Sequence, residues 1–271
     1  MAYIEIIGVS KRYAPHKQNG VETVALENVS LEIDKGNLVS IVGPSGCGKS
    51  TLLQIIAGLV SSSSGSVLLN GLSVEGPPFE MIYVFQQYTK SIFPWKSVSE
   101  NVAFGLRNRK HLSSAALHAQ CAEYISLVEL CGFEEHYPWQ LSGGMQQRVA
   151  LARGLICQPD ILLMDEPFSS VDAMTRAGLQ DLLLRLWDDF SLTVLFVTHD
   201  VDEAIYLAER VVVMSASSGP FVDDLDIALP YPRSQLVTRE SPAYSDYRRR
   251  IHQKIFCEKA VLANNIQGVG L

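Results

Sequence analysis

The stretch at residues 38–58 constrains the fold more than any other part of the chain. The apolar run at 38–42 ends directly at Gly43, a glycine-rich segment fills 43–51, and a mostly apolar stretch at 51–57 precedes Gly58. This order predicts a strand, a tight loop, a helix and a left-handed helix stop. A strand that leads through a short loop into a helix is the building unit of an α/β fold.

The glycine-rich segment also indicates phosphate binding. It has the form Gly-x-x-x-x-Gly-Lys-Ser, in which glycines accept the positive φ values that turn successive N–H groups inward around phosphate oxygens. The following helix adds the equivalent of roughly half a positive charge at its start. Lys49 is predicted to meet the β- and γ-phosphates of a nucleotide, and Ser50 to bind Mg²⁺. The predicted binding residues of this loop are Gly43, Pro44, Ser45, Gly46, Cys47, Gly48, Lys49, Ser50 and Thr51.

A second apolar run ends in two acids. Residues 161–164 are all apolar and are followed by Asp165 and Glu166. In a parallel sheet, the carboxyl ends of the strands face the ligand. Asp165 there suits Mg²⁺ held through water, and Glu166 is placed to polarise an attacking water. The alternative is a solvated acidic loop without a catalytic role.

Charge and cysteine content argue against several classes of protein. The chain of 271 residues carries a formal net charge of −7, whereas nucleic-acid-binding proteins usually carry a strongly basic face. Its five cysteines are odd in number and widely spaced, so we expect no disulfide framework, no zinc site and a reducing compartment. The first residues lack a secretion signal, and no stretch approaches the roughly 18 apolar residues of a membrane helix. A role at a membrane would therefore be exercised from outside the bilayer.

Further strands are expected on both sides of the glycine-rich segment. Residues 4–6 and 31–33 alternate apolar and charged residues, which predicts an antiparallel sheet at the start of the chain. Residues 67–69 precede an Asn-Gly turn and are expected to pair with that sheet. A buried strand is predicted at 193–197 and one more strand at 211–214. Turns or loops are predicted at 14–20, 61–65 and 215–220, and an edge strand at 221–229.

Helical patterns fill much of the remainder. Residues 97–158 are predicted to be mainly helical, with Gly132 as one helix stop and an apolar face formed by Leu117, Cys121, Tyr124, Ile125 and Val128. Leucines at helical spacing predict a helix at 176–190, which would connect two strands of a parallel sheet. A terminal helix is expected at about 243–263, where Arg248 to Arg250 form either a regulatory contact or a solvated face.

The segment Leu-Ser-Gly-Gly-Met-Gln-Gln-Arg at 141–148 lies about twenty residues before the strand that ends at Asp165. With the glycine-rich loop, it resembles the ATP-binding subunits of ABC transporters, over nearly the whole chain. The resemblance implies an α/β fold: a RecA-like P-loop NTPase core with an N-terminal antiparallel β subdomain and an inserted α-helical subdomain. The implied single domain, 1–271, divides into a core at about 1–86 and 159–233, a helical subdomain at 87–158 and a helical tail at 234–271.

The resemblance also implies ATP as the nucleotide, Mg²⁺ as the metal and two chains packed head to tail. Each ATP would lie between the P-loop of one chain and Ser142, Gly143 and Gly144 of the other, whose hydroxyl and N–H groups at a helix start can reach a γ-phosphate. Hydrolysis would remove the phosphate that both chains hold. A homodimer is sufficient because one chain holds both motifs, and a paralogous partner stays open.

Further residues match functional positions of the family. Gln86 matches the Q-loop glutamine, with Gln87 as the competing candidate, and His199 matches the switch histidine that contacts the γ-phosphate. A structural role at a strand end is the alternative for Gln86 and His199. Asp172 matches the D-loop aspartate, and Tyr13 the aromatic residue that stacks on adenine, with strand packing as its alternative. The implied catalytic residues are Glu166, His199, Gln86 and Lys49, and the implied metal ligands are Ser50, Gln86 and Asp165.

Residues 93–102, Phe-Pro-Trp-Lys-Ser-Val-Ser-Glu-Asn-Val, resemble the importer branch that serves nitrate, sulfonates, taurine, bicarbonate and related small anions. Trp95 is either buried core or part of the surface that receives a permease. Residues 214–220 and 230–233 fit the same branch, although Gly-Pro replaces the family's Pro-Gly turn. The resemblance implies an ATPase on the cytoplasmic face of a bacterial inner membrane, with an integral permease and an extracytoplasmic solute-binding protein as partners.

Three other functions stay open. A mechanical ATPase of the ABC type, acting on DNA or ribosomes, is disfavoured by the acidic charge and by the absence of a long coiled-coil insertion. A nucleotide-gated scaffold would be favoured by a missing Glu166 or His199, and both are present. The ATPase of another transporter branch is the third alternative, and the sequence does not identify the solute.

Overall fold

The computed structural model describes residues 2–14, 22–87, 91–107, 113–214 and 221–267. Its contacts divide the chain into two compact units, one formed by Met1–Pro78 with Thr193–Leu271 and the other by Phe79–Leu192. We call them unit 1 and unit 2 and describe each by itself. The subdomain boundaries that the sequence suggests stay predictions.

Unit 1 opens with an antiparallel sheet, as the alternating pattern predicted. The strands β1 (Ile4–Tyr13), β2 (Thr23–Ile33), β4 (Ser64–Leu69) and β5 (Leu72–Ser73) lie in the order β2-β1-β4-β5. Asn70 and Gly71 have φ values of 50° and 76°, which form the predicted turn between β4 and β5. The expected turn at 61–65 is shorter than predicted, because β4 already begins at Ser64. Most of the loop expected at 14–20 lies outside the described residues.

A second, mixed group of strands in unit 1 carries the glycine-rich loop. The strands β3 (Leu38–Val42), β8 (Thr193–Thr198) and β9 (Arg210–Met214) are parallel, and β10 (Phe221–Asp226) pairs antiparallel to β9 at the edge. Every residue of β3 and β8 is buried, as their apolar runs predicted. The predicted helix after the loop is α1 (Lys49–Ile56), and Gly58 follows it at φ 68°. The turn expected at 215–220 lies outside the described residues.

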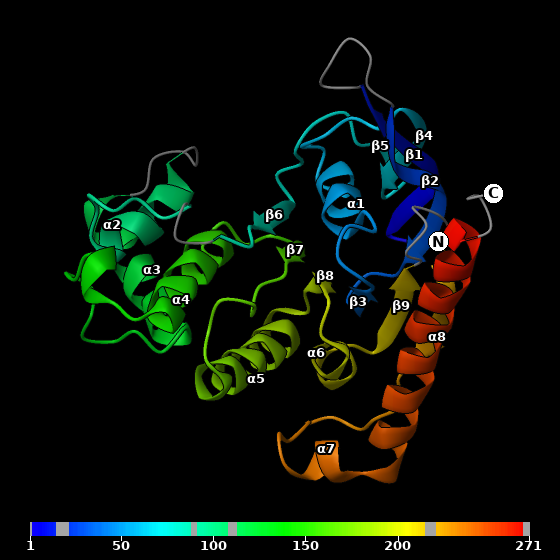
Figure 1. Ribbon diagram of the computed structural model, residues 1–271. Helices are drawn as coiled ribbons and strands as arrows, with labels where there is room; N and C mark the ends of the chain where they lie inside the picture. Colours follow the sequence, from blue (N-terminus) through cyan, green and yellow to red (C-terminus); the bar gives the residue numbers. More distant parts are fainter. Residues whose placement is uncertain (1, 15–21, 88–90, 108–112, 215–220, 268–271) are drawn as a thin grey trace. The chain divides into compact units, whose positions relative to one another are not determined.

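The terminal helix of unit 1 is also present. The helices α6 (Val201–Leu207), α7 (Val237–Glu240) and α8 (Pro242–Gln267) follow β8 and β10, and α8 packs on α6, β9 and β10 (Figure 1). Two arginines of the cluster on α8 form ion pairs with other elements, Arg248 with Asp202 at 3.3 Å and Arg250 with Asp223 at 3.1 Å. These two arginines therefore tie the helix to unit 1 instead of forming only a solvated face.

Unit 2 joins a parallel strand pair to a group of helices. The strands β6 (Met81–Val84) and β7 (Ile161–Asp165) pair in parallel. The helices α2 (Val98–Ala103), α3 (Ser114–Leu127) and α4 (Gly143–Leu155) pack on one another (Figure 1), with short 3-10 turns η2 (Phe104–Leu106) and η3 (Pro138–Gln140) and the longer α5 (Ala173–Phe190). The helical pattern expected at 97–158 is therefore confirmed.

The predicted helix stop at Gly132 is wrong. Helix α3 ends at Leu127, and Glu129 takes the left-handed conformation at φ 59°. Arginine side chains from two other helices bind the Glu129 carboxylate, and this tertiary contact outweighs the usual preference for glycine at such a position. The predicted apolar face of α3 is otherwise correct: Cys121, Tyr124, Ile125 and Val128 are buried, and Leu117 is half-buried.

The described part of the chain holds no helix that is long and apolar enough to span a membrane.

Candidate functional site

The glycine-rich loop of unit 1 is shaped by backbone conformations that only glycine adopts easily. Gly46 and Gly48 have φ values of 82° and 98°. A Cβ on Gly48 would overlap the carbonyl oxygen of Ala25, and a Cβ on Gly43 would lie 2.7 Å from that of Met214. The loop therefore packs tightly against the backbone at Ala25 and Met214 and leads directly into α1.

Lys49 fills the inside of this loop. It is the first residue of α1, its side chain is buried, and its ammonium group donates hydrogen bonds to the carbonyl oxygens of Gly43 at 2.8 Å and Pro44 at 3.0 Å. The ammonium group, the N–H groups of the first turn and the helix dipole all bring positive charge to one place. Ser50 and Thr51 follow in the same turn. These features fit the phosphate chain of a nucleotide.

His199 lies at the end of β8 and is exposed. The residues on both sides of it are fixed: the Thr198 hydroxyl donates to Glu203 at 2.8 Å and accepts from the N–H of Asp200 at 3.0 Å. The Asp200 carboxylate in turn caps α6 by accepting from the N–H of Asp202 at 2.8 Å. The exposed His199 is thus carried on a corner whose neighbouring residues are held by hydrogen bonds on both sides.

Tyr13 is the last residue of β1, and its side chain is 39% exposed. The Lys11 ammonium group lies 5.0 Å from the centre of the Tyr13 ring. Part of the ring is therefore open to solvent, and its stacking on adenine stays a prediction. An exposed aromatic face at a strand end is suited to stacking on a planar base.

The two acids at the end of β7 lie in unit 2 and have different surroundings. Asp165 is 6% exposed and accepts a hydrogen bond from the Tyr83 hydroxyl at 2.9 Å, whereas Glu166 is half-buried and accepts from the Gln86 amide at 3.2 Å. A cavity of about 420 Å³ adjoins Asp165 and is also lined by Phe85, Gln86, Gln87 and Ser91. Asp165 is therefore not part of a solvated acidic loop, and Gln86 is the glutamine that contacts Glu166.

The backbone at Glu166 is strained. Its φ of 44° is unusual for a residue with a side chain, and such strain persists only where the surrounding structure holds it. The Glu166 carbonyl accepts from the Ser169 N–H at 3.2 Å and hydroxyl at 3.0 Å, while the Gln147 amide donates to the Pro167 carbonyl at 2.5 Å. These contacts fix the direction in which the Glu166 carboxylate leaves the strand.

Sequence reasoning missed Tyr83 and Gln147. The signal for Tyr83 lies in strand register: β6 and β7 pair so that Tyr83 lies opposite Leu163, two residues before Asp165. Side chains two residues apart lie on the same face of a strand, which brings the phenol near the carboxylate. Gln147 lies within the Leu-Ser-Gly-Gly segment's own helix, but its partner, the Pro167 carbonyl, is visible only in the fold.

The Leu-Ser-Gly-Gly segment forms the start of α4. Ser142 is the N-cap, and its hydroxyl accepts from the Met145 N–H at 3.3 Å. Ser142 and Gly143 are exposed, whereas Gly144 is buried, and a Cβ on Gly144 would overlap the Thr175 methyl group. The segment therefore presents a hydroxyl and free helix-start N–H groups to solvent and packs on α5 through its second glycine.

Asp172 caps α5. Its carboxylate accepts from the N–H groups of Met174 at 3.1 Å and Thr175 at 3.0 Å. Hydrogen bonds from Thr175 are the main reason that the pKa of Asp172 is lowered, with a smaller contribution from the Met174 N–H. The aspartate thus holds the start of α5 beside the start of α4.

The described residues contain no group of three or more His, Cys, Asp or Glu side chains arranged to hold a metal ion. Ser50 of unit 1 and Gln86 and Asp165 of unit 2 each carry an oxygen atom of the kind that Mg²⁺ prefers, and their role as metal ligands stays a prediction. This ion keeps several waters and usually takes only one or two carboxylates together with the phosphates of a substrate.

Known proteins similar to this chain all belong to one family in the matches described next. The profile of the family described as ABC transporter matches residues 26–169. The aliphatic sulfonates import ATP-binding protein SsuB of a Bacillus cereus strain is 42% identical over 93% of this chain and 95% of its own. An uncharacterized ABC transporter ATP-binding protein of Methanocaldococcus jannaschii is 47% identical over 86% of this chain and 85% of its own. The dimeric structure of a post-hydrolysis ATP-binding cassette, MJ0796, bound to ADP and Pi has a TM-score of 0.72 and 33% identity, covering 83% of this chain and 98% of that chain.

Proposed function

We propose that this chain, which belongs to the ABC transporter family, drives uptake of a small anion such as a sulfonate, taurine, nitrate or bicarbonate. Within that family it is an ATP-binding and ATP-hydrolysing subunit. ATP is the nucleotide and Mg²⁺ the metal of this ATPase. The observation that carries the proposal is the similarity, over almost the full length of both chains, to a protein named for import of aliphatic sulfonates. The Pro-Trp segment at 94–95 supports the same branch.

In the proposed reaction, Lys49 and the start of α1 hold the β- and γ-phosphates, and Ser50, Gln86 and Asp165 serve the metal. When bound, Mg²⁺ neutralises charge that develops on the phosphate oxygens. Glu166 accepts a proton from the attacking water. The Gln86 amide donates a hydrogen bond to the Glu166 carboxylate and so orients that carboxylate. His199 contacts the γ-phosphate from its exposed position at the end of β8.

The signature residues Ser142, Gly143 and Gly144 and the D-loop residue Asp172 act on the nucleotide of a second chain in this proposal. The exposure of Ser142 and Gly143 supports such a role, because their hydroxyl and N–H groups are available to an incoming phosphate. The partner is a second copy or a paralogous subunit. ATP then joins two surfaces that are both incomplete alone, and its hydrolysis releases them.

The proposed membrane partner is an integral permease, supplied with solute by an extracytoplasmic binding protein, so the chain would work at the cytoplasmic face of the inner membrane. Two exposed aromatic groups of unit 2 suit an interface. The Trp95 side chain is 70% exposed beside Phe93, and Trp139 is 66% exposed and stacks on Tyr137 with a ring separation of 4.6 Å. The buried-core alternative for Trp95 is thereby wrong.

Reconstitution tests the proposal. The chain is purified with a candidate permease and solute-binding protein from the same genome, placed in liposomes, and assayed for ATP hydrolysis with and without taurine, an alkanesulfonate, nitrate or bicarbonate. We expect one of these anions to stimulate hydrolysis and to accumulate in the compartment opposite the binding protein. Hydrolysis that no such anion affects, or that is stimulated only by DNA or ribosomes, would overturn the importer assignment.

A further inference from the structure

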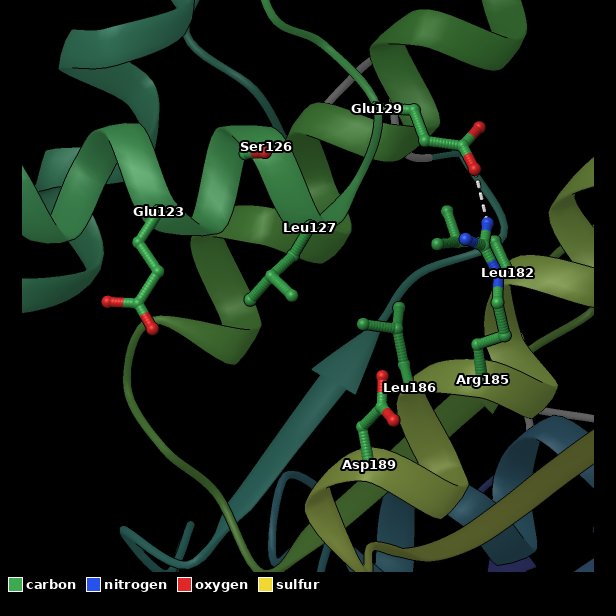
Figure 2. A pocket seen from close by; sticks show the side chains of 8 residues that line it. All are labelled: Glu123, Ser126, Leu127, Glu129, Leu182, Arg185, Leu186 and Asp189. Atoms are coloured by element: carbon green, nitrogen blue, oxygen red, sulfur yellow. Dashed lines mark hydrogen bonds and ion pairs between the residues drawn. The ribbon is translucent and has the colours of Figure 1, made fainter.

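The carboxylate of Glu129 joins arginines from two different helices of unit 2. Its Oε2 accepts from Nη1 of Arg148 on α4 at 2.5 Å. Its Oε1 accepts from Nη2 of Arg185 on α5, and Figure 2 shows this second pair. Arg148 Nη1 also donates to the Val128 carbonyl at 2.9 Å, which ties α4 to the end of α3. The left-handed backbone at Glu129 aims the carboxylate between both partners.

The two helices that Glu129 joins begin at the two motifs proposed to face a second chain. Helix α4 begins after Ser142, and α5 begins after Asp172. Their starts also touch, because the Thr175 methyl group occupies the space that a side chain at Gly144 would need. One contact at the helix starts restricts the angle between the two helices less than two separate contacts do. A second connection farther along the helices therefore holds that angle more closely.

Glu129 supplies this second connection where packing is incomplete. A cavity of about 360 Å³ lies between α3 and α5 beside the Glu129–Arg185 ion pair, with Leu182 and Leu186 among its lining residues (Figure 2). The Arg185 side chain crosses the edge of this cavity to reach the carboxylate. The pKa of Glu129 is lowered, first by the hydrogen bond from Arg148 and then by that from Arg185, so the carboxylate is charged at neutral pH.

We propose that Glu129 is a positioning residue that sets the angle between α4 and α5, so that Ser142 and Asp172 meet the second protomer together. This inference rests on the proposed function, because it concerns the pairing of two chains. Loss of the Glu129 carboxylate should weaken the ATP-dependent dimer. It should leave ATP binding by a single chain unchanged, since the phosphate-binding loop belongs to unit 1.

The test uses the full chain carrying Glu166→Gln, which is expected to bind ATP without turning it over. Sedimentation in Mg²⁺ and ATP gives the dimer dissociation constant, and binding of a fluorescent ATP analogue at low protein concentration gives the affinity of the single chain. Adding Glu129→Gln should raise the dimer dissociation constant by at least about fivefold, the lower end of the usual range of a coupling between sites, with analogue affinity unchanged. Arg185→Met should also raise the dimer dissociation constant. Arg185→Lys, which keeps the positive charge, should raise it less than Arg185→Met does.

Asp246→Asn is the matched control, because it removes an exposed acid–arginine pair within α8, where Asp246 and Arg249 lie 3.3 Å apart. It should change neither measurement. An unchanged dimer dissociation constant in both Glu129→Gln and Arg185→Met, or an equal loss of analogue affinity, would overturn the positioning role alone. A Glu166→Gln chain that stays monomeric in ATP would overturn the two-chain mechanism and this inference with it.

Discussion

Among single residues, Glu166 and Lys49 carry the proposed chemistry, and both are held firmly by their surroundings. Glu166 keeps a strained backbone and faces the Gln86 amide, and Lys49 is bound inside a loop of glycines. Strain that the surroundings maintain is typical of functional positions. Each of the two residues supports a separate prediction.

Glu166→Gln should stop turnover while ATP still binds. The amide cannot accept a proton from water, and removal of a general base typically costs about a hundredfold or more in rate. Phosphate release and analogue binding are measured on the same preparation. Wild-type hydrolysis by this variant would rule out Glu166 as the base.

Lys49→Ala should weaken ATP binding by at least about tenfold, because the chain loses both a charge that meets the phosphates and the hydrogen bonds that close the loop onto α1. The control is Lys35→Ala, since Lys35 lies over the Tyr3 ring, away from the loop. Equilibrium binding of ATP checks both variants. Full affinity in Lys49→Ala would contradict the placement of the phosphates.

Among the helices and strands, α6 follows His199, and its end is held by an arginine from a distant part of the chain. The buried Arg233 guanidinium donates to the carbonyl oxygens of Ile205, Tyr206 and Ala208 at 2.8, 2.9 and 2.9 Å, where α6 ends. Burial lowers the pKa of Arg233, and the Tyr231 ring lies 4.1 Å from the guanidinium carbon. The segment at 230–233, which the sequence associated with a transporter branch, thus has a structural role.

Arg233→Met should lower the free energy of unfolding by about 2 kcal/mol, because it leaves buried carbonyl groups without their donor. Arg249→Met removes only an exposed ion pair within α8 and should stay within about 0.5 kcal/mol of the wild type. Urea unfolding followed by circular dichroism measures both. Equal losses in the two variants would show that the cap at α6 contributes nothing.

The Glu129 bridge predicts a dependence of stability on pH. Its pKa is lower in the folded chain, so its stabilising contribution is present above the unfolded value of about 4.3 and is lost as pH falls through the folded pKa. The difference in unfolding free energy between the wild type and Glu129→Gln should therefore shrink as pH is lowered from about 6 towards 3. Denaturant titrations across this pH range measure that difference in unfolding free energy. If the difference grows as pH falls, the Glu129 carboxylate does not stabilise the fold through this bridge.

At the scale of the whole molecule, local patterns predicted the elements and missed the contacts between them. The strand, loop and helix at 38–56 follow from residues adjacent in sequence, and the antiparallel start follows from simple alternation. The failed helix stop at Gly132 shows the limit, because the arginines that hold Glu129 come from 19 and 56 residues away. The contacts of Tyr83 and Arg233 likewise depend on register and on a distant helix end.

In the proposed mechanism, ATP joins two chains through the loop of one and Ser142 of the other. Sedimentation of the Glu166→Gln chain, whose single copy has a mass of 29.9 kDa, tests it most directly. We expect a dimer in Mg²⁺ and ATP, a monomer in ADP, and a monomer that still binds ATP when Ser142→Arg is added. A Ser142→Arg chain that dimerises as well as its parent, or a parent that never dimerises in ATP, would contradict it.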